Sequence, residues 1–201
     1  MNFEIYLDID GVLNRWLRNE LSRRFAWEMK FEDWPLEHGW DIVAVHNQFV
    51  DPQHRLTKEK FWSTVTQGSW VNAGRSNLFD LLVTACPSIV GRKNVHVITT
   101  VPSDRNPAAY AGKAIWCREN LPEWLQSQVF MTTHDKSRLA RPRRLLIDDA
   151  DHNCEAWQRQ GGPVFQIPRP WNSTWVPGLT EDQIYWDLDR GLRQFRQSIY
   201  G

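Results

Sequence analysis

The sequence of 201 residues predicts an α/β fold in which helices cover both faces of a parallel sheet. Two observations carry this prediction. From about residue 95 onwards, short runs rich in β-branched residues alternate with segments of helical periodicity, as strands joined by helical crossovers do. The chain also begins with a hydrophobic segment that ends in two carboxylates and a glycine. The length suits one domain, or one core domain that carries a modest insertion.

The first strand lies within residues 3–12 and ends at Asp8-Ile9-Asp10-Gly11. Because side chains alternate along a strand, Asp8 and Asp10 point the same way, and Gly11 allows a sharp turn. Two carboxylates about 6 to 7 Å apart on one strand repel each other unless a cation lies between them. This stretch therefore predicts a metal site.

The next segment is rich in tryptophan and is expected to be mostly helical or irregular. Apolar residues at helical spacing predict a helix over residues 13–25. Residues 30–56 show no clear period, with a short strand expected at 41–45. Thr57 is expected to cap a helix that runs to Gln67 and ends at Gly68. Six of the twelve tryptophans fall in the first 70 residues, and the composition changes near residue 73.

The remaining chain alternates between helices and strands. A helix is expected from about residue 73 to 86, with Pro87 just beyond its end. A capping box of Thr180 and Gln183 predicts a final helix whose apolar positions 184, 188, 192, 195 and 199 share one side. Between these two helices the predicted elements are strands at 95–99, 129–132, 144–148 and 164–167, and helices at 107–120 and 152–160.

Polar residues follow three of the predicted strands, where ligands of such sheets bind. Asp8 and Asp10 follow the first, Thr99-Thr100 the second, and Asp148-Asp149 another. Carboxylate oxygens are the ligands that Mg²⁺ prefers, so Asp8 and Asp148 are candidate ligands, and Asp149 is a further ligand or supports one. A carboxylate also attacks phosphorus, and a second one transfers protons, which suits phosphoryl transfer with Asp8 and Asp10 in these roles.

Charge and composition limit the class of partner. Lys plus Arg and Asp plus Glu number 24 each, so no overall field attracts a polyanion, and a small-molecule substrate is expected rather than a stable nucleic-acid complex. Three scattered cysteines match neither a zinc site nor a disulfide framework. With no long apolar run, we expect a soluble cytoplasmic protein without membrane association. The sequence leaves the oligomeric state open, including a homodimer.

Four motifs occur in the order typical of one enzyme superfamily. Residues 8–12, 97–99, 136 and 147–149 resemble the motifs of the haloacid dehalogenase (HAD) phosphohydrolases. Between residues 95 and 172 the likeness is closer to the 5′(3′)-deoxyribonucleotidase family. The segments that carry this closer likeness are 112–116, 135–137, 145–149, 161–163 and 169–172.

The resemblance implies a HAD-like Rossmannoid sheet and a role for each matched residue. Asp8 would be the nucleophile and a magnesium ligand, and Asp10 the acid and base. The resemblance further implies that the Asp10 carbonyl, Asp148 and Asp149 contact magnesium. Thr99 would contact the phosphoryl group, and Lys136 would neutralise its developing charge. Thr100 and Lys113 would contact the substrate phosphate.

The resemblance also places a small helical cap after the first strand. Residues 14–72 would form this cap, and residues 1–13 and 73–201 the catalytic core. In the resembled family, cap aromatics stack on the nucleobase, and the matching candidates here are Trp16, Trp40 and Trp70. The sequence departs from the family pattern at two places. Val101 separates Thr99-Thr100 from Pro102, in the loop over the phosphate, and the spacing from Lys136 to Asp148 is slightly long; both departures bear on the choice of substrate.

The motifs and the resemblance together predict a magnesium-dependent phosphatase that acts through an aspartyl-phosphate. The resemblance implies the 5′-nucleotidase type, acting on nucleoside monophosphates with deoxy forms favoured. One alternative is a phosphatase of the same superfamily that acts on nucleic-acid ends or on a small metabolite. A second alternative is a non-catalytic binding module with the same fold. Clustered carboxylates without a metal cost stability, which counts against the second alternative.

Overall fold

Five parallel strands form the central sheet, in the order β3-β2-β1-β4-β5. The computed structural model describes residues 3–101 and 107–200. All four strand pairs are parallel, so the carboxyl ends of the strands meet at one edge. The strands are β1 (Glu4–Leu7), β2 (Val95–Thr100), β3 (Val129–Thr132), β4 (Arg144–Asp148) and β5 (Val164–Gln166).

The alternation along the strands gives the sheet two apolar faces. Ile5 pairs with Val95 and Leu145, and these side chains belong to the larger hydrophobic core. Tyr6, one position further along β1, belongs to a smaller cluster with Leu146, Ile98 and Trp157. Both faces are therefore buried, as in parallel sheets covered by helices.

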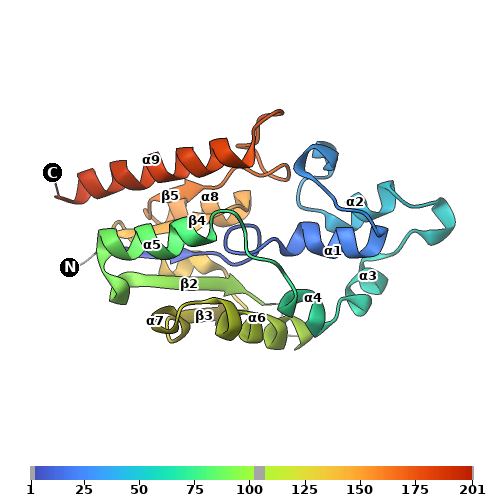
Figure 1. Ribbon diagram of the computed structural model, residues 1–201, viewed down its shortest axis with the longest axis horizontal. Coiled ribbons are helices and arrows are strands. Elements are labelled where there is room, and N and C mark those ends of the chain that lie inside the picture. The colour runs from blue at the N-terminus through green and yellow to red at the C-terminus, as the bar shows by residue number, and fades with distance from the viewer. Residues whose placement is uncertain (1–2, 102–106, 201) are drawn as a thin grey trace.

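Helices cover both faces, and the predicted fold class is confirmed. α5 (Phe79–Val90) packs against β1, β2 and α9 (Glu181–Tyr200). α8 (Asp151–Arg159) contributes Trp157 to the smaller cluster on the other face. In Figure 1, α5 and α9 run side by side at the left, and α1 to α4 lie together at the right. The other core helices are α6 (Pro107–Asn120) and α7 (Glu123–Gln126).

The chain between β1 and α5 forms the insertion. Its helices are α1 (Trp16–Phe25), α2 (Ile42–Gln48), α3 (Lys58–Thr64) and α4 (Gln67–Val71). Where the insertion leaves and rejoins the core, its two ends are hydrogen-bonded to each other. The Arg15 amide donates to the Gly74 carbonyl at 2.9 Å, and the Ser76 amide donates to the Leu13 carbonyl at 3.0 Å. Trp116 of α6 holds the end of the insertion against the core, because its indole N–H donates to the Ala73 carbonyl at 2.6 Å.

Two expectations for the insertion were wrong. Residues 42–48 form α2 rather than a strand at 41–45, because the Asp41 side chain accepts hydrogen bonds from the amides of Val43 and Ala44 and so caps a helix. Gly68 does not end a helix. α3 ends at Thr64, and Gly68 lies inside the separate helix α4. The predicted cap at Thr57 is confirmed, since its side chain accepts from the Lys60 amide.

In the core the prediction was wrong mainly at the ends of α5. This helix begins at Phe79, not near residue 73, because residues 74–76 pair with the start of the insertion. It continues through Pro87 to Val90 and stops at Gly91, whose φ is +82°. The elements at 107–120, 129–132 and 144–148 have the predicted bounds, and the capping box at Thr180 and Gln183 is present.

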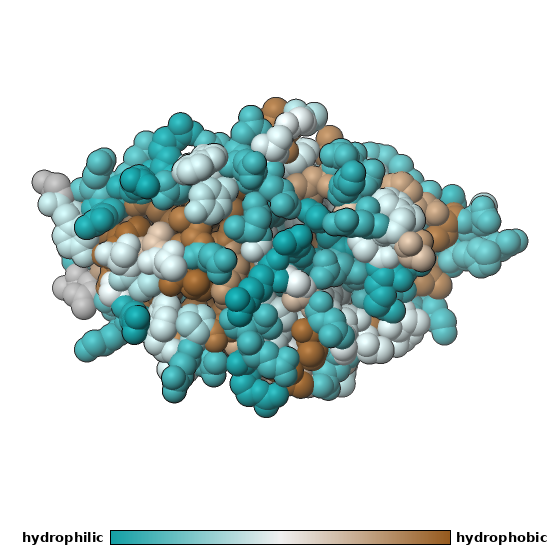
Figure 2. Space-filling view, viewed as in Figure 1, coloured by the Kyte–Doolittle hydropathy of each residue, from teal (hydrophilic) through white to brown (hydrophobic). Residues whose placement is uncertain are grey.

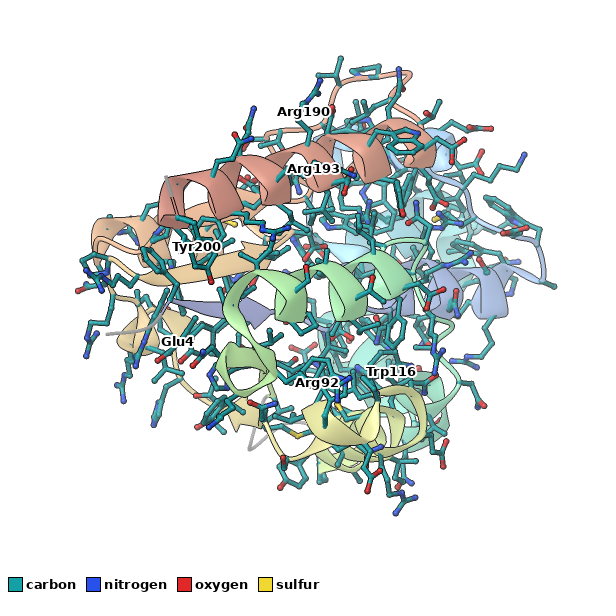
Figure 3. The ribbon with its side chains drawn as sticks, turned by 60° about the vertical axis from the view of Figure 1, so that its left-hand side comes forward. Glu4, Arg92, Trp116, Arg190, Arg193 and Tyr200 are labelled. Carbon is teal, nitrogen blue, oxygen red and sulfur yellow. The ribbon has the colours of Figure 1, made fainter. Side chains whose placement is uncertain are left out.

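The surface is mixed in polarity. Figure 2 shows hydrophilic atoms over most of one face, with hydrophobic atoms gathered over the left half, where α5 and α9 lie. Figure 3 shows Arg190 and Arg193 on α9, and Tyr200 near the end of that helix. The Tyr200 hydroxyl donates to the Ile89 carbonyl at 2.7 Å, which ties α9 to α5. Among residues 3–101 and 107–200, no helix has both the length and the apolar character needed to cross a lipid bilayer.

Candidate active site

Lys136 joins two strand-end carboxylates at the centre of the site. Its ammonium lies 2.7 Å from Asp8 Oδ1, just after β1, and 2.7 Å from Asp148 Oδ2, at the end of β4. Lys136 is 2% exposed, Asp8 6% and Asp148 0%, so these ion pairs are shielded from solvent. β1 and β4 are neighbours in the sheet, which is why two residues 140 positions apart in the chain face one lysine.

Asp148 is further fixed by the start of α8. Its Oδ1 accepts from the Ala150 amide at 2.9 Å, and the Asn153 side-chain amide lies 3.2 Å from both carboxylate oxygens. These donors hold the Asp148 carboxylate in one orientation.

Asp149 lies against the loop that follows β1. Its Oδ2 accepts from the indole N–H of Trp171 at 2.7 Å, whereas its buried Oδ1 has no hydrogen-bond partner among the described residues. Gly11 has a φ of +82°, and a Cβ atom there would lie 2.0 Å from Asp149 Oδ2. Glycine at this position therefore permits both the turn and the close approach of the Asp149 carboxylate.

A second lysine binds the other loop carboxylate. Lys113, on α6, lies 2.6 Å from Asp10 Oδ2 and also donates to Thr99 Oγ1 and to the Thr100 carbonyl, both at 2.9 Å. Lys113 and Thr99 are buried, but the Thr100 side chain is exposed. Asp10, Thr99 and Lys113 thus form one connected group beside the Asp8 cluster. Pro102, in the loop predicted to depart from the family pattern, lies outside the described residues.

The acidic cluster fits a hard divalent cation. Asp8, Asp148 and Asp149 each offer an oxygen, and these three oxygens lie within 4.8 Å of one another. An all-oxygen donor set suits Mg²⁺ better than a softer metal. The unpartnered Asp149 Oδ1 is a buried acceptor, and such an atom is costly unless a cation, water or donor satisfies it.

The pKa shifts of the clustered side chains also suit a bound cation. Burial raises the pKa of the Asp8 carboxyl to about 7; Lys136 opposes this rise and Asp148 reinforces it. Burial also raises the pKa of Asp149 well above its ordinary value, with Asp148 and Asp8 adding to the effect. Burial alone would lower the pKa of Lys136, but its ion pairs with Asp148 and Asp8 raise it. Burial therefore disfavours the ionised forms of Asp8 and Asp149, and a bound cation would favour them.

The candidate base-stacking tryptophans have different surroundings. Trp16 is 3% exposed and stacks on Trp70, with ring centroids 4.7 Å apart, and on Trp62, at 5.9 Å. Trp70 is also 3% exposed, so both rings are covered by protein. Trp40 is partly exposed and packs edge-on against Trp171 at 5.9 Å. Because Trp171 donates to Asp149, Trp40 is separated from the acidic cluster by one residue.

Sequence reasoning assigned no role to several residues that shape the site. Asn14 donates to Asp10 Oδ1 at 3.1 Å, and Asn153 contacts Asp148. Arg169, 2% exposed, donates through Nε to the Gly11 carbonyl at 2.9 Å. Asn172 donates to the Asp149 carbonyl at 2.6 Å. Asn153 and Asn14 lie close in the chain to the residues that they contact, five positions after Asp148 and four after Asp10. The contacts of Arg169 and Asn172 depend on the fold.

The arrangement brings together groups that phosphoryl transfer can use. Two carboxylates, Asp8 and Asp10, and two buried ammonium groups lie at one edge of the sheet. Positive groups fixed around a reacting centre stabilise the charge that develops on phosphoryl oxygens. This geometry does not select the alcohol that carries the phosphate. Other contacts have to recognise that alcohol.

Comparison with known proteins supports the fold. Neither a family model nor a curated protein sequence matches the chain. Among solved structures, the chain is similar to a haloacid dehalogenase-like family hydrolase from Xanthomonas campestris, at 10% identity and a TM-score of 0.53, covering 98% of this chain and 94% of that one. This likeness shows that the chain has a HAD-like fold.

Two further solved structures are more distant. A HAD family hydrolase from Deinococcus radiodurans R1, with bound phosphate and sodium, gives a TM-score of 0.46 at 11% identity over 89% of this chain and 83% of that one. A predicted phosphatase from Clostridium acetobutylicum gives 0.47 at 10% identity, covering 87% and 88%. The assignment of the fold does not depend on these two.

Proposed function

We propose that the protein is a magnesium-dependent phosphatase that hydrolyses nucleoside monophosphates through an aspartyl-phosphate on Asp8. The observation that carries the proposal is that the two loop carboxylates contact two different buried lysines. Asp8 faces Lys136 at 2.7 Å, and Asp10 faces Lys113 at 2.6 Å. A lone structural ion pair does not require this duplication, whereas two-step phosphoryl transfer needs a nucleophile, a proton donor and two sources of positive charge.

In the first step an oxygen of Asp8 attacks phosphorus, and the bond from phosphorus to the ester oxygen breaks. Asp10 gives its proton to the departing oxygen, so that an alcohol leaves. In the second step water attacks the same phosphorus, its proton passes to Asp10, and the bond to Asp8 breaks to release phosphate. Lys136, Lys113 and Thr99 lie beside the two carboxylates, so their fixed charges and dipoles would stabilise the phosphoryl oxygens in both steps.

The metal would be held by the carboxylates of Asp8, Asp148 and Asp149 and by the backbone carbonyl of Asp10. When bound, Mg²⁺ supplies positive charge that stabilises the phosphoryl oxygens. Asn153 and the Ala150 amide fix Asp148 in orientation, as outer contacts of a metal site do.

The nucleotide part of the proposal rests on the resemblance of residues 95–172 to the deoxyribonucleotidase family. Of the three candidate tryptophans, Trp40 has a partly exposed ring, while Trp16 and Trp70 are stacked and buried. We therefore assign base contact first to Trp40. Stacking of one base on an aromatic side chain contributes about 1 to 3 kcal/mol, so replacing Trp40 by alanine should weaken nucleotide binding by that amount.

The experiment that tests the function is a phosphate-release panel with Mg²⁺ and with a chelator. The substrates are 5′ and 3′ monophosphates of ribo- and deoxyribonucleosides, 3′-phosphorylated oligonucleotides and sugar phosphates. The proposal predicts chelator-sensitive turnover that is fastest for a nucleoside monophosphate. Faster turnover of an oligonucleotide end or a sugar phosphate would overturn the nucleotide part, and no turnover of any ester would overturn the phosphatase.

A further inference from the structure

Asn14 lies where the insertion leaves the core, and its side chain reaches back to Asp10. The residue is 1% exposed. Its Nδ2 donates to Asp10 Oδ1 at 3.1 Å, and its Oδ1 accepts from the backbone amide of Trp16 at 3.0 Å. One buried side chain therefore connects the proposed proton-transfer residue with the first residue of α1.

The two contacts fix which way the Asn14 amide points. The Trp16 amide is a donor only, so it must face the oxygen of the Asn14 side chain. The NH₂ group then faces Asp10. The reversed orientation would set a donor against the Trp16 amide and an oxygen against a carboxylate, which is unfavourable at both ends. Asn14 is thus a specified donor to Asp10.

The backbone around Asn14 is also held in place. Its carbonyl accepts from the Gly11 amide at 3.1 Å, and its own amide donates to the Ile9 carbonyl at 2.9 Å. The next residue, Arg15, is paired with Gly74 on the returning chain. A side chain on a backbone held from both sides can fix a neighbour's orientation closely.

The two oxygens of Asp10 therefore have different partners. Oδ1 is held by Asn14, and Oδ2 faces the Lys113 ammonium at 2.6 Å, on the side where Thr99 also lies. We infer that Asn14 is a positioning residue that holds Asp10 through Oδ1 and so presents Oδ2 as the oxygen that exchanges the proton. This inference rests on the proposed function. In it, the proton leaves Oδ2 for the departing alcohol oxygen and returns to Oδ2 from the attacking water.

The test compares two phosphate esters that differ in their need for a proton. p-Nitrophenyl phosphate releases a stabilised phenolate that departs without protonation, whereas an alkyl phosphate such as β-glycerophosphate requires an acid. The variants are Asn14→Ala, which removes the donor, and Asn14→Asp, which keeps the shape and the acceptor for Trp16 but loses the donor. Asn14→Ser restores a small donor. Asn77→Ala is the control, because Asn77 lies near the same junction and its side chain donates to the Glu181 carbonyl, away from Asp10.

Asn14→Ala and Asn14→Asp should lower kcat/KM for the alkyl ester by about 100-fold, the scale of a misplaced catalytic group. For p-nitrophenyl phosphate, kcat/KM should change by less than about threefold, because it reports only steps up to departure of the phenolate. For the same ester, kcat should fall and nitrophenol should appear in an initial burst, because the second step still needs Asp10. Asn14→Ser should recover part of the alkyl activity, and Asn77→Ala should behave as wild type.

Equal loss of kcat/KM for the two esters in both Asn14 variants, with wild-type turnover intact, would overturn the positioning role and leave the phosphatase standing. If wild type hydrolysed neither ester, nor any other phosphate ester, the proposed function itself would fail and this inference with it. Thermal melting identifies variants that do not fold. If Asn14→Ala is among them, Asn14→Asp decides the matter, because it preserves the volume and the Trp16 contact.

Discussion

Lys136 determines the charge balance of the site. Its ammonium is shared between Asp8 and Asp148, and both acids are almost fully buried. In such surroundings an ion pair is stabilising only while both partners are present, because an isolated buried charge is very costly. Lys136 contacts two carboxylates, and Asp149 offers a further oxygen within 4.8 Å of theirs. This grouping of three acids beside one ammonium is the observation from which we propose a cation site rather than a structural ion pair alone.

Gly11 allows the Asp149 carboxylate to lie against the loop that follows β1, and replacing this glycine tests that role. Gly11→Ala should destabilise the fold for two reasons: a positive φ costs about 1 to 2 kcal/mol for alanine, and the methyl group would collide with Asp149 at a further cost of about 1 to 3 kcal/mol. Urea unfolding measures the sum.

Gly178→Ala is the matched control, because Gly178 has a φ of +86° and no atom lies within 4 Å of its added Cβ. It should show the conformational cost alone. If the two variants lost the same free energy of unfolding, Asp149 would not be held against the loop as described.

At the scale of elements, helix α4 of the insertion packs closely against helix α6 of the core. α4 packs against α6 at Gly112, where an added Cβ would lie 2.7 Å from the Gln67 carbonyl oxygen and 2.8 Å from Trp70 Cβ. The residue after Gly112 is Lys113, which binds Asp10 and Thr99. The same turn of α6 thus receives the insertion and carries a candidate catalytic cation.

Gly112→Ala should therefore destabilise the protein, although alanine favours helices. The gain in helix propensity is about 1 kcal/mol, and overpacking against backbone costs about 1 to 3 kcal/mol. Gly68→Ala, in α4, is the control, since its nearest contacts are 3.6 Å away and it should stabilise by up to about 1 kcal/mol. Chemical unfolding of both variants checks the contrast. A Gly112→Ala protein as stable as Gly68→Ala would show that the two helices are not in close contact.

Elements with strong local signals were predictable from the sequence. The strand at 144–148 and the helix at 107–120 follow from apolar runs and periodicity alone. α2 was not predictable in this way: Ile42, Val43 and Val45 favour a strand, but the cap at Asp41 and burial within the insertion decide for a helix. The start of α5 is likewise set by pairing at the junction and not by its own residues.

For the candidate site, the order of the acidic residues along the chain allowed the sheet edge to be predicted. Asp8, Asp10 and Asp148 follow strands, and the parallel order brings them together. The contacts of Trp171 and Arg169 could not be predicted, because each joins segments that only the tertiary fold makes adjacent. Asn14 lies only four residues after Asp10, but their contact depends on the turn between them. The burial of Trp16 and Trp70 against each other is of the same kind.

For the whole molecule, the proposed metal site predicts that Mg²⁺ changes global stability. A ligand that binds only the folded chain raises the free energy of unfolding, by about 2.7 kcal/mol when its concentration is 100 times its Kd. Saturating Mg²⁺ should therefore raise the unfolding midpoint, and Asp148→Asn should abolish most of that increment. Asp80→Asn, at an exposed position on α5, should preserve it. An increment in Asp148→Asn equal to that of wild type would place the ion elsewhere.

The central claim is that Asp8 becomes phosphorylated during turnover, and rapid acid quenching tests it most directly. The protein is mixed with Mg²⁺ and a ³²P-labelled ester that the panel identifies as a substrate, and the labelled peptide is sequenced by mass spectrometry. We predict an acid-stable, hydroxylamine-sensitive label on Asp8, with both label and phosphate release lost in Asp8→Asn. Sustained phosphate release by a folded Asp8→Asn variant, or a label on another residue, would contradict the account.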